Sequence, residues 1–162
     1  MISFYAVLSQ PNYLTMQTDW QAALSDFKFK MKLALRWSDV DEAGHVNNAV
    51  YLTYFEETRV VYFNESVQWD WKKDGVILAN ANVNYIRPLF YPENAFVYAR
   101  TIRIGSKSLE LEYIVVVENG DKKELIAKGT TVLVMFDYKS NQSVPVPEEI
   151  RAKLNAYEQK TF

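Results

Sequence analysis

The sequence predicts an α+β domain in which a long central helix is wrapped by a curved antiparallel sheet of about five strands. Apolar residues recur at every second position in five segments, as they do in strands that face a core on one side. One further segment, Asn47 to Asn64, is apolar around most of its helical circumference, which is typical of a buried helix. Such a helix needs cover on most of its sides, and a strongly curved sheet supplies that cover.

The predicted strands are defined by their alternating faces. The first spans 27–37, where apolar side chains alternate with basic ones, and the others span 77–85, 95–104, 109–117 and 125–136. In the second strand, one face is expected to carry Ile77, Ala79, Ala81, Val83 and Tyr85, and the other Asn80, Asn82 and Asn84. The dipeptide Asn119-Gly120 predicts a tight hairpin of the primed type before the last strand.

Two helix boundaries and one domain boundary complete the predicted organisation. Asn47 is the expected N-cap of the long helix, because a short amide side chain suits that position. Pro147 opens a short terminal helix. Residues 1–25 lack the regular pattern of the rest and are expected to form an N-terminal extension, with one or two helical turns within 18–25. Residues 26–162 are expected to form a single domain.

Composition argues against several classes of function. The chain of 162 residues is 49% hydrophobic and carries 18 basic and 20 acidic side chains, a net charge of -2. That balance gives no basic field for phosphate backbones, so we expect no nucleic-acid partner. No run reaches the roughly 20 apolar residues of a membrane span. The absence of cysteine removes thiolate metal sites and cysteine nucleophiles and is compatible with a cytoplasmic protein.

Chemically capable side chains concentrate in the turn before the long helix. Six such residues fall close together there: Asp39, Asp41, Glu42, His45, Asn47 and Asn48. The first N–H groups of a helix lack intrahelical acceptors, and the helix dipole adds roughly half a positive charge at that end. The N–H of Asn48 is therefore a candidate donor to a carbonyl oxygen or an oxyanion. The same residues also suit a structural role as caps and turn formers around Gly44.

The segment from Trp37 to Tyr51, continuing to Tyr54-Phe55-Glu56 and Arg59, resembles the acyl-CoA thioesterase family of hotdog fold. This family includes 4-hydroxybenzoyl-CoA thioesterase-like enzymes and relatives of the plant acyl-ACP thioesterases. The string Asp-x-x-Gly-His-Val-Asn-Asn carries most of the likeness, weaker matches lie at 84–89 and 104–108, and the whole resemblance covers about residues 27 to 150. It implies hydrolysis of an acyl-CoA thioester in lipid metabolism, no cofactor beyond the CoA of the substrate, and a homodimer or homotetramer.

The resemblance also assigns roles to particular residues. Asp41 matches the catalytic carboxylate, as general base or nucleophile, and Asn48 matches the residue whose backbone N–H polarises the carbonyl. His45 matches a catalytic histidine of the plant branch, but Ala43 stands where that branch has an asparagine, which leaves the role of His45 open. The same likeness implies a substrate-binding set of Asn47, Tyr51, Glu56, Arg87, Ser106, Lys107 and Ser108, the last four toward the CoA arm.

Other assignments stay open on the sequence alone. The acyl carrier can be a carrier protein instead of CoA, and the fold also hosts non-catalytic acyl-CoA binding modules. A hydratase or dehydratase of the same architecture would use His45 as its base. A triad of Ser38, His45 and Asp39 lacks the Gly-x-Ser-x-Gly elbow. A metal site is not expected, because one histidine among scattered carboxylates offers too few convergent ligands.

Overall fold

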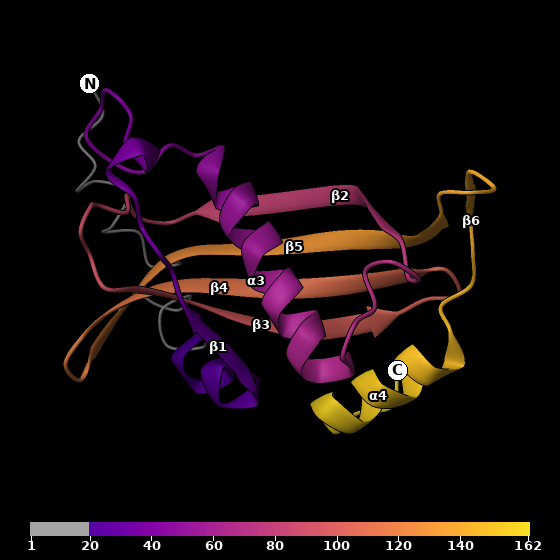
Figure 1. The fold of residues 1–162 in the computed structure, drawn as a ribbon. Coiled ribbons are helices and arrows are strands. Elements are labelled where there is room, and N and C mark those ends of the chain that lie inside the picture. The colour runs from indigo at the N-terminus through magenta and orange to yellow at the C-terminus, as the bar shows by residue number, and fades with distance from the viewer. Residues whose placement is uncertain (1–19) are drawn as a thin grey trace.

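One long helix crosses the inner side of a curled antiparallel sheet in the computed structural model, which describes residues 20–162 (Figure 1). The elements follow the chain in this order: η1 (Leu24–Asp26), β1 (Phe29–Lys32), η2 (Trp37–Asp39), α3 (Val50–Val67), β2 (Val76–Tyr85), β3 (Ala95–Ile104), β4 (Ser108–Asn119), β5 (Lys122–Asp137), β6 (Gln142–Ser143) and α4 (Glu148–Glu158). The strand order across the sheet is β1-β3-β4-β5-β2, with the short β6 added to β5. The predicted architecture is therefore confirmed.

The first strand is shorter than its alternating pattern predicts. β1 pairs with β3 over Phe29–Lys32 only, and the N–H of Leu33 makes one more bond, 2.9 Å long, to the carbonyl of Ala95. Because β3 begins at Ala95, the residues after Leu33 have no strand beside them and leave the sheet. Alternation of side chains alone did not reveal where the partner strand ends.

A bulge in β2 changes which side chains face the core. The pairing shifts between Leu78, opposite Leu133, and Asn80, opposite Val132, so Ala79 is the extra residue. Leu78 lies on the inner face of the sheet, opposite the buried Leu133. Further along β2 the inner face carries Ala81, Val83 and Tyr85. The prediction that Ile77 and Ala79 lie on that face was wrong, because a bulge inserts one residue and reverses the alternation.

The long helix starts later than predicted. It runs over Val50–Val67, with Ala49 as its N-cap residue, and ends where Gln68 adopts a left-handed conformation at φ 56°. Asn47 is not the N-cap; its Oδ1 instead accepts a 2.9 Å hydrogen bond from the N–H of Ala49. This side-chain bond forms a local turn that delays the helix, a competition that short amide side chains commonly set up.

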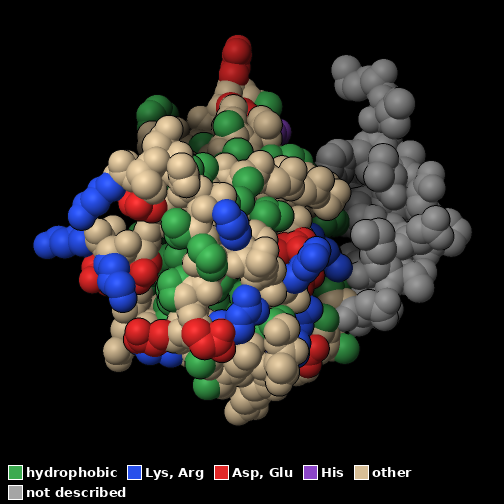
Figure 2. Space-filling model, turned by 90° about the vertical axis from the view of Figure 1, so that its right-hand side faces the viewer, with side chains coloured by type: hydrophobic (Ala, Val, Ile, Leu, Met, Phe, Trp, Pro, Cys, Tyr) green, Lys and Arg blue, Asp and Glu red, His purple; other side chains and the backbone are tan. Residues whose placement is uncertain are grey.

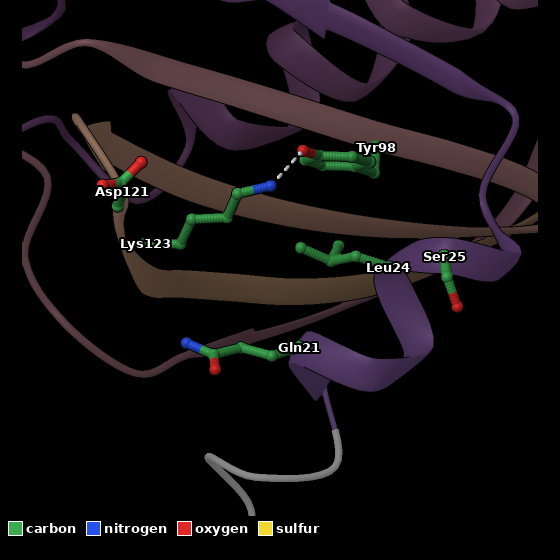
Figure 3. Close-up of a pocket in the computed structure, with 6 residues that line it drawn as sticks. All are labelled: Gln21, Leu24, Ser25, Tyr98, Asp121 and Lys123. Carbon is green, nitrogen blue, oxygen red and sulfur yellow. Dashed lines mark hydrogen bonds between the residues drawn. The ribbon is translucent and has the colours of Figure 1, made fainter.

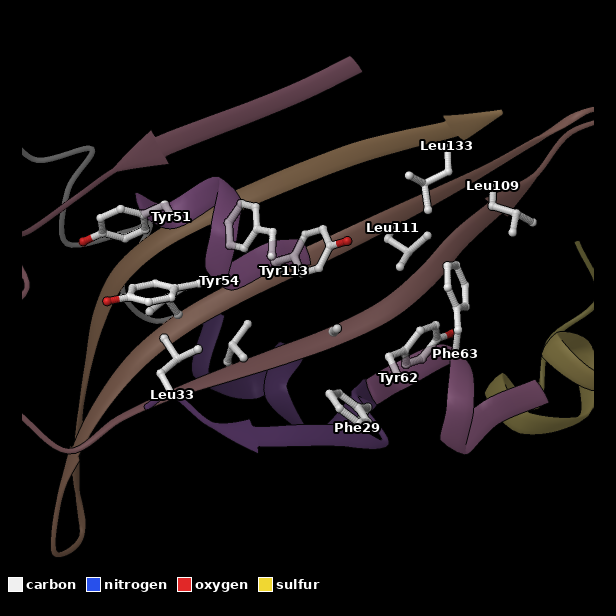
Figure 4. Close-up of a cluster of buried hydrophobic side chains, with 14 of the residues drawn as sticks. Phe29, Leu33, Tyr51, Tyr54, Tyr62, Phe63, Leu109, Leu111, Tyr113 and Leu133 are labelled. Carbon is white, nitrogen blue, oxygen red and sulfur yellow. The ribbon is translucent and has the colours of Figure 1, made fainter. Parts of the chain in front are cut away.

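The helix is buried on one side only, which corrects the expectation that it needs cover on most of its sides. Tyr54, Phe55, Tyr62 and Phe63 are fully buried against the sheet, in a core that includes Leu109, Leu111, Tyr113 and Leu133 (Figure 4). Leu52 and Val61, in contrast, are 41% and 43% exposed. The four aromatic residues supply most of the buried side, and the apolar residues on the other side stay open.

A close contact in this core fixes how the helix sits on the sheet. The ring of Phe55 stacks on that of Tyr113, with centroids 4.3 Å apart and planes 9° from parallel. Gly129 lies directly beneath: a Cβ there would overlap the Phe55 ring and would lie 2.9 Å from the carbonyl oxygen of Asn82. The missing side chain of Gly129 therefore allows the helix to approach the sheet.

Gly129→Ala is expected to lower the free energy of unfolding by about 1–3 kcal/mol, because the added methyl group overpacks the core. Urea unfolding measures the effect. Adding Phe55→Leu should return part of the loss if the clash is with the ring, since contacting sites couple in a double-mutant cycle. Equal stability of wild type and Gly129→Ala would contradict this packing account.

The remaining predicted elements are confirmed with small adjustments. The β4–β5 hairpin is present, but its two-residue loop is Gly120-Asp121, since Asn119 pairs with Lys122, and Gly120 has φ 60°. Helix α4 begins at Glu148 after Pro147. Residues 20–23 are helical and lead into η1, in line with the turns expected within 18–25, whose first two residues lie outside the described part.

The outer face of the sheet carries a second apolar cluster. Trp20, Leu24 and Phe27 pack there against side chains of β3, β4 and β5, namely Tyr98, Ile114, Val116 and Leu125. The residues just before β1 thus cover part of the sheet opposite α3. The domain boundary predicted at residue 25 stays a prediction.

Candidate functional site

The turn before α3 is held closed by backbone hydrogen bonds. Val40 and Val46 form an antiparallel bridge. The N–H of Asp41 donates to the carbonyl of His45 over 3.0 Å, and the N–H of Gly44 donates to the carbonyl of Asp41 over 2.9 Å. Gly44 has φ 82°, the left-handed conformation that glycine adopts freely, as predicted. The turn therefore presents Asp41 on a defined backbone.

The Asp41 carboxylate is partly buried and keeps one oxygen without a hydrogen bond to described residues. Its Oδ1 accepts the N–H of Ala43 over 2.9 Å, and its Oδ2 lies 3.9 Å from Nδ1 of His45. The side chain is 27% exposed, and that of His45 is 36% exposed. The nearest hydrogen-bonding contact of Nδ1 is the carbonyl of Val46, at 3.3 Å. Asp41 is thus accessible, with an imidazole beside it that is also within reach of solvent.

The N–H of Asn48 takes no part in the hydrogen bonds that the described residues form at the helix start. The N–H of Asn47 donates to the carbonyl of Asp39 (2.9 Å) and that of Val50 to the carbonyl of Asn47 (3.0 Å). Within residues 20–162, no hydrogen-bond acceptor is present for the N–H of Asn48. Asn48 lies two residues before α3 and not in its first helical turn as expected, but it is still at the positive end of the helix dipole.

Tyr85 fixes the same helix tip from the sheet. Its hydroxyl donates to the carbonyl of Asn48 over 2.8 Å, and its ring meets that of Tyr51 edge-on at 5.0 Å. Burial raises the pKa of Tyr51, so this phenol stays neutral near the site. Tyr85 was absent from the predicted site. An aromatic residue ending the inner face of a strand was the available signal, but its contact with Asn48 depends on the tertiary fold.

Eight of the ten predicted site residues fall into two separate groups, and the other two, Glu56 and Arg87, lie within α3 and just after β2. Asp41, His45, Asn47, Asn48 and Tyr51 lie together around the turn and the helix tip. The turn before β4 lies at the other end of the sheet, because Ser108 is opposite Val134, which pairs with Ile77, whereas Tyr85 is opposite Ala127. The seven steps along β5 from Ala127 to Val134, which face this stretch of β2, span roughly 23 Å at the usual strand rise.

Of the four residues predicted to bind the CoA arm, Arg87 and Lys107 have their charged groups engaged within the chain. Arg87 donates to both carboxylate oxygens of Glu93, at 2.9 and 3.1 Å, and lies 2.9 Å from Glu124. Burial would lower the pKa of Arg87, but these carboxylates outweigh it and the pKa is raised. Lys107 donates to the carbonyl and the hydroxyl of Ser143, at 2.8 and 3.2 Å. Ser106 accepts the N–H of Val146 through its carbonyl, at 2.9 Å.

Asp39 is a structural residue of the turn. Its carboxylate is 4% exposed and accepts hydrogen bonds from the Tyr54 hydroxyl (2.7 Å), the N–H of Arg36 (2.8 Å) and the Arg36 guanidinium (3.0 Å). This set of partners does not include His45 or Ser38, so the arrangement is not a Ser-His-Asp triad. Burial alone would raise the pKa of Asp39, but the bonds from Tyr54 and Arg36 outweigh it and the pKa is lowered.

The lowered pKa of Asp39 predicts acid sensitivity. Below its ordinary value of 3.8 the unfolded carboxyl takes up a proton that the folded one still resists, so stability should fall as the pH drops through that range. Asp39→Asn should remove part of this acid dependence and cost about 1–3 kcal/mol at neutral pH, where a charge-assisted bond is lost. Urea unfolding of both proteins between about pH 2.5 and 7 measures it. Parallel pH profiles would contradict the assignment.

A surface groove lies on the outer side of the sheet, the face opposite α3. It has a volume of about 490 Å³ and is lined by Gln21, Leu24, Ser25, Tyr98, Asp121 and Lys123 (Figure 3). Lys123 is already occupied, since it donates to the Tyr98 hydroxyl over 3.2 Å and pairs with Glu118 at the same distance. Because the groove lies on the face of the sheet opposite α3, it is not part of the candidate site around Asp41.

The described residues give no sign of a metal centre. Nowhere in 20–162 do three or more His, Cys, Asp or Glu side chains gather as ion ligands. Among the same residues, no helix has the length and apolar character needed to cross a membrane. On the face nearest β6, basic and acidic side chains are mixed, with apolar ones between them (Figure 2). That face accordingly lacks a field of one sign.

The chain matches known proteins over most of its length. Residues 35–154 match the model of a family described as the thioesterase-like superfamily. YsmA of Bacillus subtilis (strain 168) is 30% identical over 146 residues, covering 89% of this chain and 95% of YsmA. The long-chain acyl-CoA thioesterase FadM of Escherichia coli (strain K12) is 25% identical over 126 residues, covering 76% of this chain and 94% of FadM.

A solved structure gives the same result at the level of the fold. The crystal structure of a thioesterase from Thermus thermophilus, complexed with coenzyme A and Zn, superposes with a TM-score of 0.74 at 36% identity. The superposition covers 85% of this chain and 98% of the Thermus chain. The matching sequence and the matching fold thus point to the same group of proteins.

Proposed function

Because this chain belongs to the thioesterase-like superfamily and is a thioester hydrolase, we propose that it hydrolyses an acyl-CoA to a carboxylic acid and CoA. The observation that carries the proposal is that one closed turn presents both an accessible carboxylate, Asp41, and the N–H of Asn48, which has no acceptor within residues 20–162. The similarity to FadM, a long-chain acyl-CoA thioesterase, supports acyl-CoA as the substrate class.

Each group has a distinct task in the proposed reaction. The N–H of Asn48, helped by the helix dipole, polarises the thioester carbonyl and stabilises the oxyanion that forms. Asp41 activates water as a general base or attacks the carbonyl carbon itself. His45 and Asn47 hold the turn, with Nδ1 of His45 3.9 Å from Oδ2 of Asp41. The tetrahedral intermediate then collapses with loss of the CoA thiolate. When water attacks, this step releases the carboxylic acid; when Asp41 attacks, a water then hydrolyses the acyl anhydride on Asp41 to release it.

These groups are sufficient on energetic grounds. A carboxylate with an ordinary pKa near 4 is a modest base, but a thiol with a pKa near 8.5 leaves as thiolate without full protonation. One oxyanion-hole donor is typically worth about 3 kcal/mol of transition-state stabilisation. A weak base combined with a well-placed donor therefore suffices for a thioester.

We propose that two copies pair through the β2 edge, as part of a homodimer or homotetramer. β2 is the last strand of the sheet, and most of its ten residues are exposed. Apolar side chains lie along it, including Ile77, Leu78 and Tyr85, which are 39%, 41% and 49% exposed. A long, partly apolar edge left open is an aggregation hazard, and pairing with a second copy removes it.

A two-fold axis at this edge completes the site. An edge strand paired with its own copy around such an axis runs antiparallel to it, so the Ile77 end of one copy meets the Tyr85 end of the other. The turn holding Ser106, Lys107 and Ser108 of the partner subunit then comes to the end where Asp41 lies. The partner's turn lies about three strand spacings from β2 of the first copy, roughly 14 Å. This span suits a long arm such as that of CoA.

A screen for thiol release tests the proposed function. The purified protein is given short, long and aromatic acyl-CoAs and the matching acyl carrier protein thioesters, and the rates of thiol release are compared. Hydrolysis of CoA thioesters is expected. Turnover confined to carrier-protein thioesters would show that the acyl carrier is acyl carrier protein and not CoA. Tight binding of acyl-CoA without any turnover would instead identify a binding module, and water addition to an enoyl-CoA that depends on His45 would identify a hydratase.

A further inference from the structure

The three residues just before α3 lie outside the regular hydrogen-bond ladder of the helix, which begins at Val50. The N–H of Asn47 donates to the carbonyl of Asp39 over 2.9 Å. The N–H groups of Ala49 and Val50 donate to Oδ1 and to the carbonyl of Asn47, over 2.9 and 3.0 Å. From 47 to 50, the N–H of Asn48 is thus the one backbone donor without an acceptor within residues 20–162. Its direction depends on how the neighbouring peptide groups are held.

Two peptide groups meet at Asn48, and each is held through its carbonyl. A trans peptide group is planar, so its N–H and C=O point in opposite directions and holding one fixes the other. The group that contains the Asn48 N–H is held at the Asn47 carbonyl by Val50. The next group is held at the Asn48 carbonyl by the hydroxyl of Tyr85, over 2.8 Å. No backbone N–H of residues 20–162 donates to that carbonyl, so Tyr85 supplies the bond that fixes it.

Tyr85 ties this segment to the sheet, whereas the other bonds are local. It is the last residue of β2 and lies opposite Ala127 of β5. Its ring meets the ring of Tyr51 edge-on, with centroids 5.0 Å apart, and Tyr51 is buried in the core. The hydroxyl is therefore presented by a side chain that is packed against the helix and carried by a paired strand.

We propose that Tyr85 is a positioning residue for the oxyanion donor: through its bond to the Asn48 carbonyl it keeps the Asn48 N–H aimed at the thioester. Tyr85 acts through Asn48 and not by contact with the reacting atoms. This inference rests on the proposed acyl-CoA thioesterase function. An oxyanion donor must lie about 2.7–3.1 Å from the developing charge, and a displacement of about 1 Å can cost up to about a hundredfold in rate.

Tyr85→Phe tests the role of the hydroxyl, because phenylalanine keeps the ring that packs on Tyr51. We expect kcat on acyl-CoA to fall about tenfold with KM within about twofold of wild type, since the oxyanion contact is made most strongly in the transition state. Tyr138→Phe is the matched control. The Tyr138 hydroxyl donates to the carbonyl of Val76 over 2.9 Å, at the opposite end of β2. Its loss removes a bond of the same kind and should leave kcat within about twofold.

A second measurement reports on the donor without turnover. Infrared difference spectroscopy of an acyl-CoA with an isotope-labelled carbonyl, bound to Asp41→Asn protein, measures how strongly that carbonyl is polarised. Binding is expected to lower its stretching frequency, because the Asn48 N–H polarises the bond. Adding Tyr85→Phe should remove part of this lowering, and adding Tyr138→Phe should not. Hydrolysis by wild type tests the proposed function separately, since the frequency shift requires binding alone.

The outcomes separate positioning from a purely structural role. Wild-type kcat in Tyr85→Phe would overturn the inference, as would an equal loss of kcat in Tyr138→Phe. A loss of kcat in Tyr85→Phe with an unchanged carbonyl frequency would also overturn it, because the donor would then still be in place. Thermal unfolding and light scattering establish that the variants are folded and keep the mass of the wild type.

Discussion

Asp41→Asn is expected to lower kcat on acyl-CoA at least about a hundredfold while the protein stays folded, the magnitude typical of a lost acid–base group. The amide keeps the size of the carboxylate and can still accept the N–H of Ala43, a bond of 2.9 Å in the wild type. What it loses is the negative charge that activates water or attacks the carbonyl. The loss should therefore appear in kcat more than in KM.

The neighbouring Glu42 provides a matched control. It is exposed in the same turn, and Glu42→Gln removes the same charge from the same loop. Thiol-release kinetics of wild type and both variants measure the contrast, with Glu42→Gln expected within about threefold of wild type, since an exposed charge contributes little. Near-full turnover by Asp41→Asn would contradict the assignment of this carboxylate.

Ala81→Pro is expected to yield a monomer and to abolish most acyl-CoA hydrolysis. The N–H of Ile86 donates to Ile126 over 2.9 Å, and in an antiparallel ladder every second residue bonds the same neighbour. The backbone groups of Asn84 and Asn82 therefore point to β5, and those of Val83 and Ala81 point to the free edge. Proline at 81 removes a donor from that edge and leaves the bonds to β5 in place.

Light scattering coupled to size exclusion measures the mass, and thiol release measures the activity. A loss of at least about a hundredfold in activity is expected, because the partner's turn at 106–108 no longer reaches the site and a misplaced substrate costs that order. Ala81→Lys, which repels its own copy across the two-fold axis, should act in the same direction if the proline perturbs folding. A folded monomer of full activity would contradict an interface site.

Local patterns in the sequence revealed the element types but not the registers. Alternation located β2 correctly, yet the bulge at Ala79 reversed its first residues, because pairing with β5 and not the pattern decides the register. In the same way, β1 ends where β3 begins, at Ala95, a limit set by a strand about sixty residues away in the chain. The helix begins at Val50 and not at Asn47 because the Asn47 side chain accepts a hydrogen bond from the N–H of Ala49 and forms a local turn there.

The candidate site was predictable to the extent that it is local. Asp41, His45 and Asn48 lie within one turn of chain, and the turn places them together. Tyr85 became relevant only through a tertiary contact, the hydrogen bond to the Asn48 carbonyl. The turn at 106–108 is distant within one chain, so its part in the proposed site depends on a second copy that local sequence patterns do not describe.

The account depends on one carbonyl group lying between the Asp41 carboxylate and the N–H of Asn48. The crystal structure of Asp41→Asn protein with a bound acyl-CoA measures this directly. The account predicts a carbonyl oxygen about 2.7–3.1 Å from the Asn48 nitrogen, with residue 41 facing the carbonyl carbon. A bound thioester whose carbonyl contacts neither residue would contradict it.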